Sequence, residues 1–168
     1  MADDVVAPKR IDRRAAGGAI LAVAALAGAV GWLGYRDHQI QQAQQHRESY
    51  VQVARQAAIN LTTISYAQAD ADVQRIIDST TGAFRDDFGQ RSRPFVDVVK
   101  HAQSASEGTV TEAGLESVDG DQADVLLAVS VRTTIAGEVQ PEPRRWRMRI
   151  SLQDTGDGPK VSNVAFVQ

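Results

Sequence analysis

The fold of this chain is decided by residues 144–153, which read RRWRMRISLQ. Large apolar side chains occupy every second position of this stretch, and arginines stand between them. Because side chains of a β-strand point alternately to the two faces of a sheet, the pattern predicts a strand that is buried on one face and charged on the other. The apolar set is Trp146, Met148, Ile150 and Leu152, and the charged set is Arg145, Arg147 and Arg149.

Three further segments alternate in the same way and are predicted to be strands. A tight hairpin is expected at Asp119-Gly120, a dipeptide that favours such turns, and the turn Gly156–Pro159 precedes the final segment. Because the connections are short, consecutive strands should pair in antiparallel order. The sequence therefore predicts a curved four-stranded sheet built from Thr109–Val118, Ala123–Ile135, Arg144–Gln153 and Lys160–Val167.

A helical pattern comes before the strands. Apolar or small residues recur at intervals of three and four from residue 40 to residue 64, and only Arg47 interrupts them: Ile40, Ala43, Tyr50, Ala54, Ala57, Leu61 and Ile64. This period predicts one long helix. The helix could pack on its own domain, or it could form a coiled coil with a partner or with a second copy of the chain.

Shorter helices are expected between this long helix and the sheet. The second helix should begin near Asp70 or Asp72, since carboxylates favour a helix N-terminus. Residues 79–82 then break the chain, and a short helix carries Phe84 and Phe88. A third helix is expected to open at Pro94, with a buried stripe of Phe95, Val98, Val99 and Ala102. About three helices on one face of the sheet make an α+β fold.

Residues 15–35 contain no charged side chain and are predicted to be a transmembrane anchor, since a helix of this length spans roughly 31 Å. Four basic residues precede it, which predicts a cytoplasmic N-terminus by the positive-inside rule. The expected organisation is a basic cytoplasmic tail (1–14), a single-pass anchor in the plasma membrane (15–35) and an extracytoplasmic α+β domain (36–168). A cleaved signal peptide, with Ala27-Gly28-Ala29 as its cleavage region, is the alternative.

Composition excludes several kinds of chemistry. The net charge of −3 does not favour nucleic acid, and the absence of cysteine rules out disulfides and thiol chemistry. The three histidines, at positions 38, 46 and 101, are too far apart in sequence to indicate a metal site, and no phosphate-binding glycine loop is present. We therefore expect no cofactor and no metal.

The order of the elements resembles the cone-shaped α+β fold of nuclear transport factor 2 and ketosteroid isomerase. More specifically, nearly the whole chain resembles the Mce-associated membrane proteins of actinobacterial cell envelopes. The segments that carry this resemblance are Thr80–Phe84, Gly108–Val110, Ala123–Val129 and Val161–Val164. The resemblance implies an accessory or stabilising subunit of an Mce complex that imports lipids or sterols, with membrane and extracytoplasmic Mce subunits as partners.

No catalytic set stands out in the sequence. Enzymes with a cone-shaped fold use an acid or base together with an oxyanion donor in an apolar pocket. Asp86 and Asp87 are expected to face solvent between two phenylalanines. Tyr66 could point inward and His101 could line a cavity next to the third helix, but the spacing identifies no set of acid, base and oxyanion donor. We therefore expect a non-catalytic binding module.

Two surfaces are candidates for partner binding. On the long helix they are Ile40, Ala43, Arg47 and Tyr50, and on the third strand Arg145, Arg147 and Arg149. The arginines could be a solvated face balanced by Glu112 and Glu116, or a cationic stripe that docks an acidic protein or anionic lipid headgroups. The alternatives to an accessory subunit are a lipid carrier that uses a cavity in the cone, and a scaffold like the inner-membrane assembly subunit of type IV secretion systems. Self-association stays open.

Overall fold

The computed structural model describes residues 44–167. The predicted tail (1–14), the predicted anchor (15–35) and the candidate residues Ile40 and Ala43 lie outside the described residues. The chain divides into two units, Met1–Gln44 and Gln45–Gln168, and the second contains nearly everything described below. Among the described residues, no helix is both long enough and apolar enough to cross a membrane.

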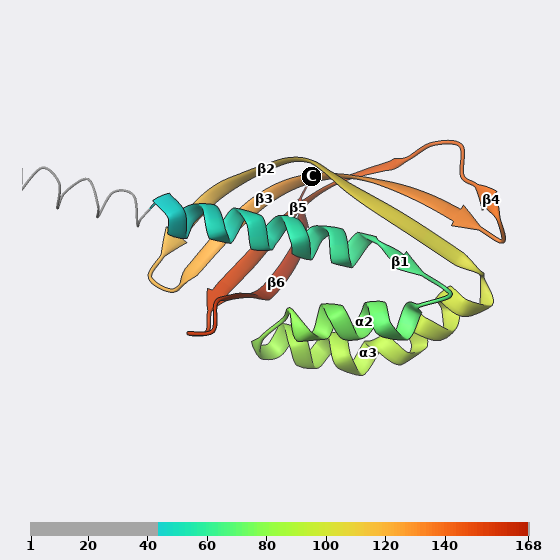
Figure 1. Cartoon of the computed structure of the whole chain (residues 1–168), viewed down its shortest axis with the longest axis horizontal. Coiled ribbons are helices and arrows are strands. Elements are labelled where there is room, and N and C mark those ends of the chain that lie inside the picture. Colours follow the sequence, from blue (N-terminus) through green and yellow to red (C-terminus); the bar gives the residue numbers. More distant parts are fainter. Residues whose placement is uncertain (1–43, 168) are drawn as a thin grey trace, which may run out of the picture. The chain divides into compact units, whose positions relative to one another are not determined.

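A curled antiparallel sheet forms one layer of the fold (Figure 1). Its four long strands occur close to where the alternating patterns predict them: β2 (Ser104–Asp119), β3 (Gln122–Ile135), β5 (Arg144–Asp154) and β6 (Pro159–Val167). Two strands of two residues each, β1 (Ile64–Ser65) and β4 (Glu138–Val139), pair with β2 and β3 and extend the predicted four-stranded sheet to six strands. The order across the sheet is β1-β2-β3-β5-β6. Gly120, at φ 59°, closes the predicted hairpin between β2 and β3.

The first described helix (residues 44–62) lies against one face of this sheet (Figure 1). Its small side chains Ala54, Ala57 and Ala58 are buried with Tyr50, and their size allows the helix to approach the strands closely. The sheet side of this core consists mainly of Val125, Leu127, Val129, Val131, Met148, Ile150, Leu152 and Val161. From Tyr50 onward the helix therefore packs on its own domain.

The helices α2 (Ala69–Asp78) and α3 (Gly82–His101) pack on each other around a second apolar cluster. The prediction of a short helix followed by another that opens at Pro94 is wrong, because α3 runs through Pro94 without a break. Pro94 and Gln90, whose carbonyl the proline leaves unbonded, are both exposed, so that carbonyl can bind water. The predicted buried stripe is also wrong in part: Phe95, Val98 and Ala102 are exposed, and Ala102 lies just after the end of α3. The buried face consists of Ser92, Val96 and Val99.

The turn at residues 79–82 joins the helix pair to the sheet. The Thr81 N–H donates to the Val161 carbonyl at 2.8 Å, and the Val161 N–H donates to the Ser79 carbonyl at 3.0 Å. Thr80 is buried and forms a parallel bridge with Val161 at the start of β6. Gly82 then begins α3 at φ 60°, a backbone conformation that residues with a Cβ atom rarely adopt. The Thr80–Phe84 segment is therefore a structural joint.

Helix 44–62 comes close to the sheet at Gly108 of β2. A Cβ atom built on Gly108 would lie 1.8 Å from Thr62 Oγ1, so only glycine fits there. The Gly108 N–H also donates to Thr63 Oγ1 at 3.1 Å. The glycine of the segment Gly108–Val110 thus sets the spacing between the end of the helix and β2.

Candidate partner-binding site

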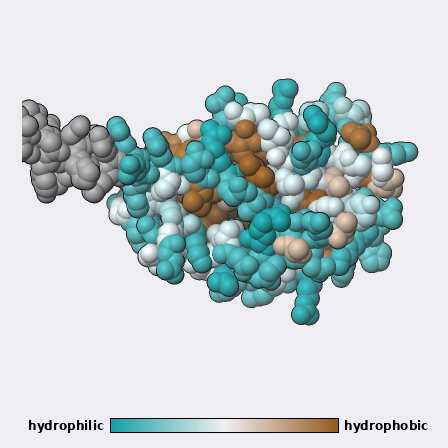
Figure 2. All heavy atoms as spheres, viewed as in Figure 1, coloured by the Kyte–Doolittle hydropathy of each residue, from teal (hydrophilic) through white to brown (hydrophobic). Residues whose placement is uncertain are grey.

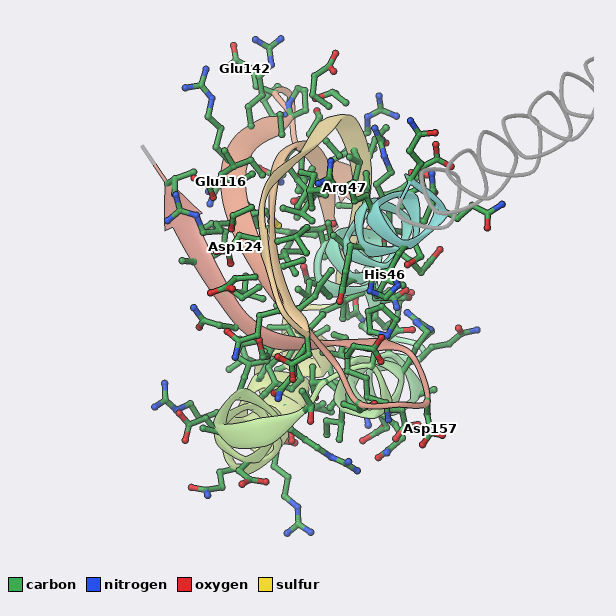
Figure 3. All side chains as sticks on the ribbon, turned by 90° about the vertical axis from the view of Figure 1, so that its left-hand side faces the viewer. His46, Arg47, Glu116, Asp124, Glu142 and Asp157 are labelled. Carbon is green, nitrogen blue, oxygen red and sulfur yellow. The ribbon has the colours of Figure 1, made fainter. Side chains whose placement is uncertain are left out.

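The arginines of β5 lie on the sheet face that points away from helix 44–62. Met148, Ile150 and Leu152 are fully buried against the helix, so the intervening Arg145, Arg147 and Arg149 point to the other face, called here the outer face. Figure 3 shows Glu116 and Asp124 on this outer face, and His46 and Arg47 on the side that carries the helix.

Arg149 has an acidic partner on the outer face. Its Nε lies 2.5 Å from Glu116 Oε2 and its Nη2 lies 2.7 Å from Glu116 Oε1, a bidentate pairing. The hydrogen bond with Glu116 and its negative charge raise the pKa of Arg149 above its usual value. Because β3 lies between β5 and β2, this pair spans two strand spacings. For Arg149, the expected balance by Glu116 is observed.

Asp124 of β3 extends the polar contacts across the same three strands. Its two carboxylate oxygens accept hydrogen bonds from Ser117 Oγ on β2 at 3.2 Å and from Ser151 Oγ on β5 at 2.7 Å. Together with the Arg149–Glu116 pair, these bonds give Arg149, Glu116 and Asp124 partners within the sheet. This part of the outer face is called here the closed half.

Arg145 and Arg147 occupy the other half and differ from Arg149. Within residues 44–167 neither forms an ion pair with an acidic side chain. Both line a groove of about 420 Å³, whose other walls are Thr111, Ala128, Val129, Ser130, Trp146 and Val167. Arg147 and Ala128 also border a second depression of about 360 Å³, beside Glu112 and Leu126. Two cationic groups therefore line an open groove with a partly apolar surface.

The core face of the sheet is packed against helix 44–62 within residues 44–167. The residues that would line a cavity in the cone, such as Val125 and Ile150, are fully buried against helix 44–62. On the surface that carries this helix, Figure 2 shows hydrophobic residues in small groups separated by hydrophilic ones. The outer-face groove is therefore the candidate site that the described residues support best.

The helix candidates are placed differently from the arginines. Tyr50 is fully buried, and its hydroxyl donates to the Asp121 carbonyl at 3.4 Å. Burial raises the pKa of the Tyr50 phenol above its ordinary value, and the charges of Asp154 and Asp121 raise it further. Arg47 is exposed on the helix surface. The structure does not bring these two residues together with the arginines of β5.

The acid and base candidates are scattered. Asp86 and Asp87 are exposed on α3, as expected, and Tyr66 is 44% exposed. His101 Nδ1 lies 2.7 Å from the Asp97 carbonyl on the surface of α3. No group of three or more potential metal-ligating side chains occurs within the described part of the chain. The absence of catalysis stays a prediction.

Sequence reasoning missed most of the groove. Thr111, Ser130 and Val167 come from three different strands, and only the strand register brings them beside the arginines. Ser130 lies directly opposite Arg145, and Ala128 and Val167 flank Arg147. Alternation within a single segment carries no signal for such a set.

These features define a class of protein: an α+β domain with a curled antiparallel sheet, a core face filled by its own helix and a partly cationic outer face. The chain belongs to the family described as "Uncharacterized protein Rv1363c/MT1408-like", which it matches over residues 12–168. A relative in Mycobacterium tuberculosis, Uncharacterized protein Rv1363c, is 40% identical over 124 residues. That match covers 74% of this chain and 48% of the relative, so the chain spans about half the length of the curated relative that it matches.

Solved structures share the fold. The periplasmic domain of DotI superposes with a TM-score of 0.59 at 17% identity, covering 71% of this chain and 94% of that domain. An IcmL-like type IV secretion system protein from Legionella pneumophila gives a TM-score of 0.59 at 15% identity, covering 72% and 91% of the two chains. CagV, a VirB8 homologue from the Helicobacter pylori type IV secretion system, gives 0.57 at 9% identity, with coverage of 72% and 98%. At these identities the likeness shows the fold alone.

Proposed function

We propose that this chain is a membrane-anchored, non-catalytic assembly subunit of a multi-protein complex in the cell envelope. The observation that carries the proposal is the filled core face: helix 44–62 occupies the side of the sheet where a cone-shaped enzyme or carrier would hold its ligand. A domain without that cavity has its outer surfaces available for protein contacts. The proposal places residues 15–35 in the plasma membrane and the domain outside it.

The fold likeness supports an assembly role. DotI, the IcmL-like protein and CagV carry the same fold, and the latter two are described as type IV secretion proteins. We extend to this chain only the scaffold role, in which an anchored domain holds other subunits in place. Self-association of such a subunit is part of the proposal.

We propose an Mce-type lipid or sterol import complex as the machine that this subunit serves. Support comes from the resemblance of Thr80–Phe84 and the other named segments to Mce-associated membrane proteins. The mycobacterial relative fits an actinobacterial envelope setting. The carrier alternative is less well supported because the core face is filled.

The test is a pulldown of tagged full-length protein from membranes of its native host in a gentle detergent, after brief chemical crosslinking. Mass spectrometry of proteins and lipids together is the readout. Recovery of Mce permease or substrate-binding subunits would support the proposal in full, and recovery of other envelope subunits would support only the assembly role. Stoichiometric lipid without such subunits would favour a carrier, and recovery of neither would overturn the proposal.

Topology needs a separate measurement. Alkaline phosphatase, which is active only outside the cytoplasm, would be fused after residue 12 and after residue 40. The proposal expects activity from the second fusion alone. Equal activity of both fusions would contradict the placement of the anchor and the domain.

A further inference from the structure

The outer face of β5 contains one satisfied arginine and two that lack a described acidic partner. Arg149 holds Glu116 in a bidentate pair, whereas Arg145 and Arg147 line the groove of about 420 Å³. The same residue type, repeated at every second position of one strand, thus meets a carboxylate at one end of the strand only. A carboxylate supplied from outside would complete the series.

β6, beside this groove, is an edge strand of the sheet. Among the described residues, only the turn before α3 forms backbone hydrogen bonds with its free edge, at Val161, and α3 itself also lies close to β6. Native edge strands usually carry charges or prolines that block pairing with another chain. β6 has Pro159 and Lys160 at its start but no charged residue from Val161 to Val167. The unprotected part of the edge is therefore the part that borders the groove at Val167.

An exposed aromatic side chain lies on the other side of the same edge. Phe166 is 68% exposed and packs edge-on against Trp146, with ring centroids 5.5 Å apart. Phe166 lies opposite Met148, so it belongs to the sheet face opposite to the arginines. A strand added beside β6 would meet an apolar surface on one face and arginines on the other.

The Arg149–Glu116 pair shows that an arginine of β5 can reach such a strand. Neighbouring strands lie about 4.8 Å apart, so this pair spans roughly 10 Å across β3. A strand added to the free edge of β6 would lie at the same two-strand distance on the opposite side of β5. Val167 is the residue that Arg147 would have to cross, and it is apolar, whereas Arg145 lies past the last described residue of β6. On the other side of β5, Glu112 borders the depression beside Arg147 but forms no ion pair with it.

We propose that the free edge of β6 together with Arg145 and Arg147 docks an extended acidic segment of a partner protein, which pairs with β6 as an additional strand. Where this segment passes Val167 and continues beyond it, alternate side chains are carboxylates directed to Arg147 and Arg145, and the apolar side chain between them packs on Phe166. Backbone pairing supplies affinity and the alternate side chains supply specificity, as in other cases of strand addition. The inference rests on the proposed assembly function and names the class of partner that this site would hold.

The first experiment measures fluorescence anisotropy of a labelled peptide with alternating Glu and Val, titrated with full-length protein in detergent micelles. We expect binding that weakens with salt and falls at least about tenfold when the glutamates become glutamines, because charge-assisted bonds are lost. A peptide N-methylated on one edge keeps its charges but cannot pair, and should also lose about tenfold or more. Equal binding of all three peptides would overturn the proposal.

Matched variants locate the site on the protein. Arg145→Gln/Arg147→Gln should weaken binding of the glutamate peptide by about tenfold or more. Arg91→Gln/Arg93→Gln removes two exposed charges from the middle of α3 instead and should leave binding within about twofold, because the segment that bridges to β6 lies before the start of α3, at Thr80. Circular dichroism spectra of both variants check that the fold is kept. Equal weakening by both pairs would mean a general charge effect and would overturn the site.

An anionic lipid is the alternative occupant of the site, and a separate experiment tests for it. Micelles that contain phosphatidylglycerol are compared with micelles that contain phosphatidylcholine. Two results together would mean that the arginines recognise lipid headgroups and that the strand proposal fails. The first is that phosphatidylglycerol displaces the peptide only when Arg145 and Arg147 are present. The second is that the N-methylated peptide binds as well as the normal one.

The pulldown separates this inference from the proposed function. Loss of one or more subunits from the Arg145→Gln/Arg147→Gln sample supports the docking site. Unchanged recovery of the subunits would contradict the docking site without affecting the proposed assembly role. If the wild-type protein recovers no subunits, the assembly role fails and the peptide titration alone decides the docking site.

Discussion

The two faces of β5 differ in environment although their residues alternate along one strand. On the core face, Met148, Ile150 and Leu152 are fully buried against helix 44–62 and contribute to stability. On the outer face, the arginines are largely solvated, and an exposed ion pair adds little to stability. The difference teaches that adjacent positions of one strand can contribute to stability on one face and remain available to solvent on the other, where we propose that they bind a partner. Variants of the core face should change folding, and variants of the outer face should change binding.

The largest effect should come from the core face. Ile150→Ala removes a fully buried side chain and should lower the free energy of unfolding by about 2–5 kcal/mol, since a cavity remains. The matched control, Arg147→Gln on the same strand, should stay within about 0.5 kcal/mol of the wild type. Urea denaturation followed by circular dichroism measures both. Similar losses for the two variants would mean that the faces are not distinct in energy.

A slightly smaller loss is expected where the helix meets β2. Gly108→Ala would place a Cβ atom 1.8 Å from Thr62 Oγ1, so the helix end must move, at a cost of about 1–3 kcal/mol. In a Thr62→Gly background the same change should cost clearly less, because most of the clashing atoms are gone. A double-mutant cycle of unfolding midpoints checks this. Additive losses would show that the contact does not limit the spacing.

Two glycine substitutions, one at the joint between α2 and α3 and one inside α3, should change the free energy of unfolding in opposite directions. Gly82→Ala forces a side chain into φ 60° and should cost about 1 kcal/mol through backbone strain, as the space around it is open. Gly89→Ala lies inside α3, also in open space, and should stabilise by about 0.5–1 kcal/mol. Thermal unfolding of both variants gives the sign. Stabilisation by Gly82→Ala would refute the strain at the joint.

Tyr50 makes the core face sensitive to high pH. Because burial and two nearby carboxylates raise its pKa in the folded state, the folded protein holds the phenolic proton more tightly than the unfolded chain does. The associated stability is fully present below about pH 10, the unfolded pKa, and is lost as the pH rises through the folded pKa. Urea midpoints at pH 9 and pH 11 should fall more steeply for the wild type than for Tyr50→Phe. Parallel slopes would argue against this role.

The smallest effect belongs to the closed half of the outer face. Arg149→Gln and Glu116→Gln should each change stability only slightly, and their coupling in a double-mutant cycle should shrink as salt is added. A coupling that persists at 1 M salt would indicate a pair shielded from solvent. The outer face would then resemble the core face more than proposed.

The sheet was predictable because its signals are local. Period-two alternation identifies Ala123–Ile135 and Arg144–Gln153 as strands without tertiary information. The Asp-Gly turn at residues 119–120 likewise identifies β2 and β3 as neighbours. The two-residue strands β1 and β4 carry too few residues to show any period. Their pairing with β2 and β3 exists only once the long strands are in place.

The helix pair was harder to predict because its signals conflict. Proline often opens a helix, so Pro94 suggested a boundary, whereas the structure tolerates it inside α3 on the exposed side. Phe95 is larger and more apolar than Ser92, yet Ser92 is buried and Phe95 is 41% exposed. Which face of α3 is buried depends on its packing against α2. The hydrophobicity of α3 alone does not show this packing.

The candidate site was half predictable. Arginines that share a face follow directly from alternation, and Glu116 was named as a balancing charge. Which arginine meets that charge depends on the register of β2 against β3, and two irregularities, after Val110 and after Leu115, shift that register. No local pattern in the sequence gives the position of such a bulge.

The packing of helix 44–62 on strands that come much later in the chain has a consequence for biosynthesis. The apolar stripe of the helix, from Tyr50 to Ala58, is covered chiefly by β3, β5 and Val161. Roughly one hundred residues must be added after Ala57 before β5 is complete at Asp154, which takes about 5–20 s at usual elongation rates. Until then the nascent helix lacks at least part of its native cover, so we expect it to be a favoured client of chaperones until the last strands emerge.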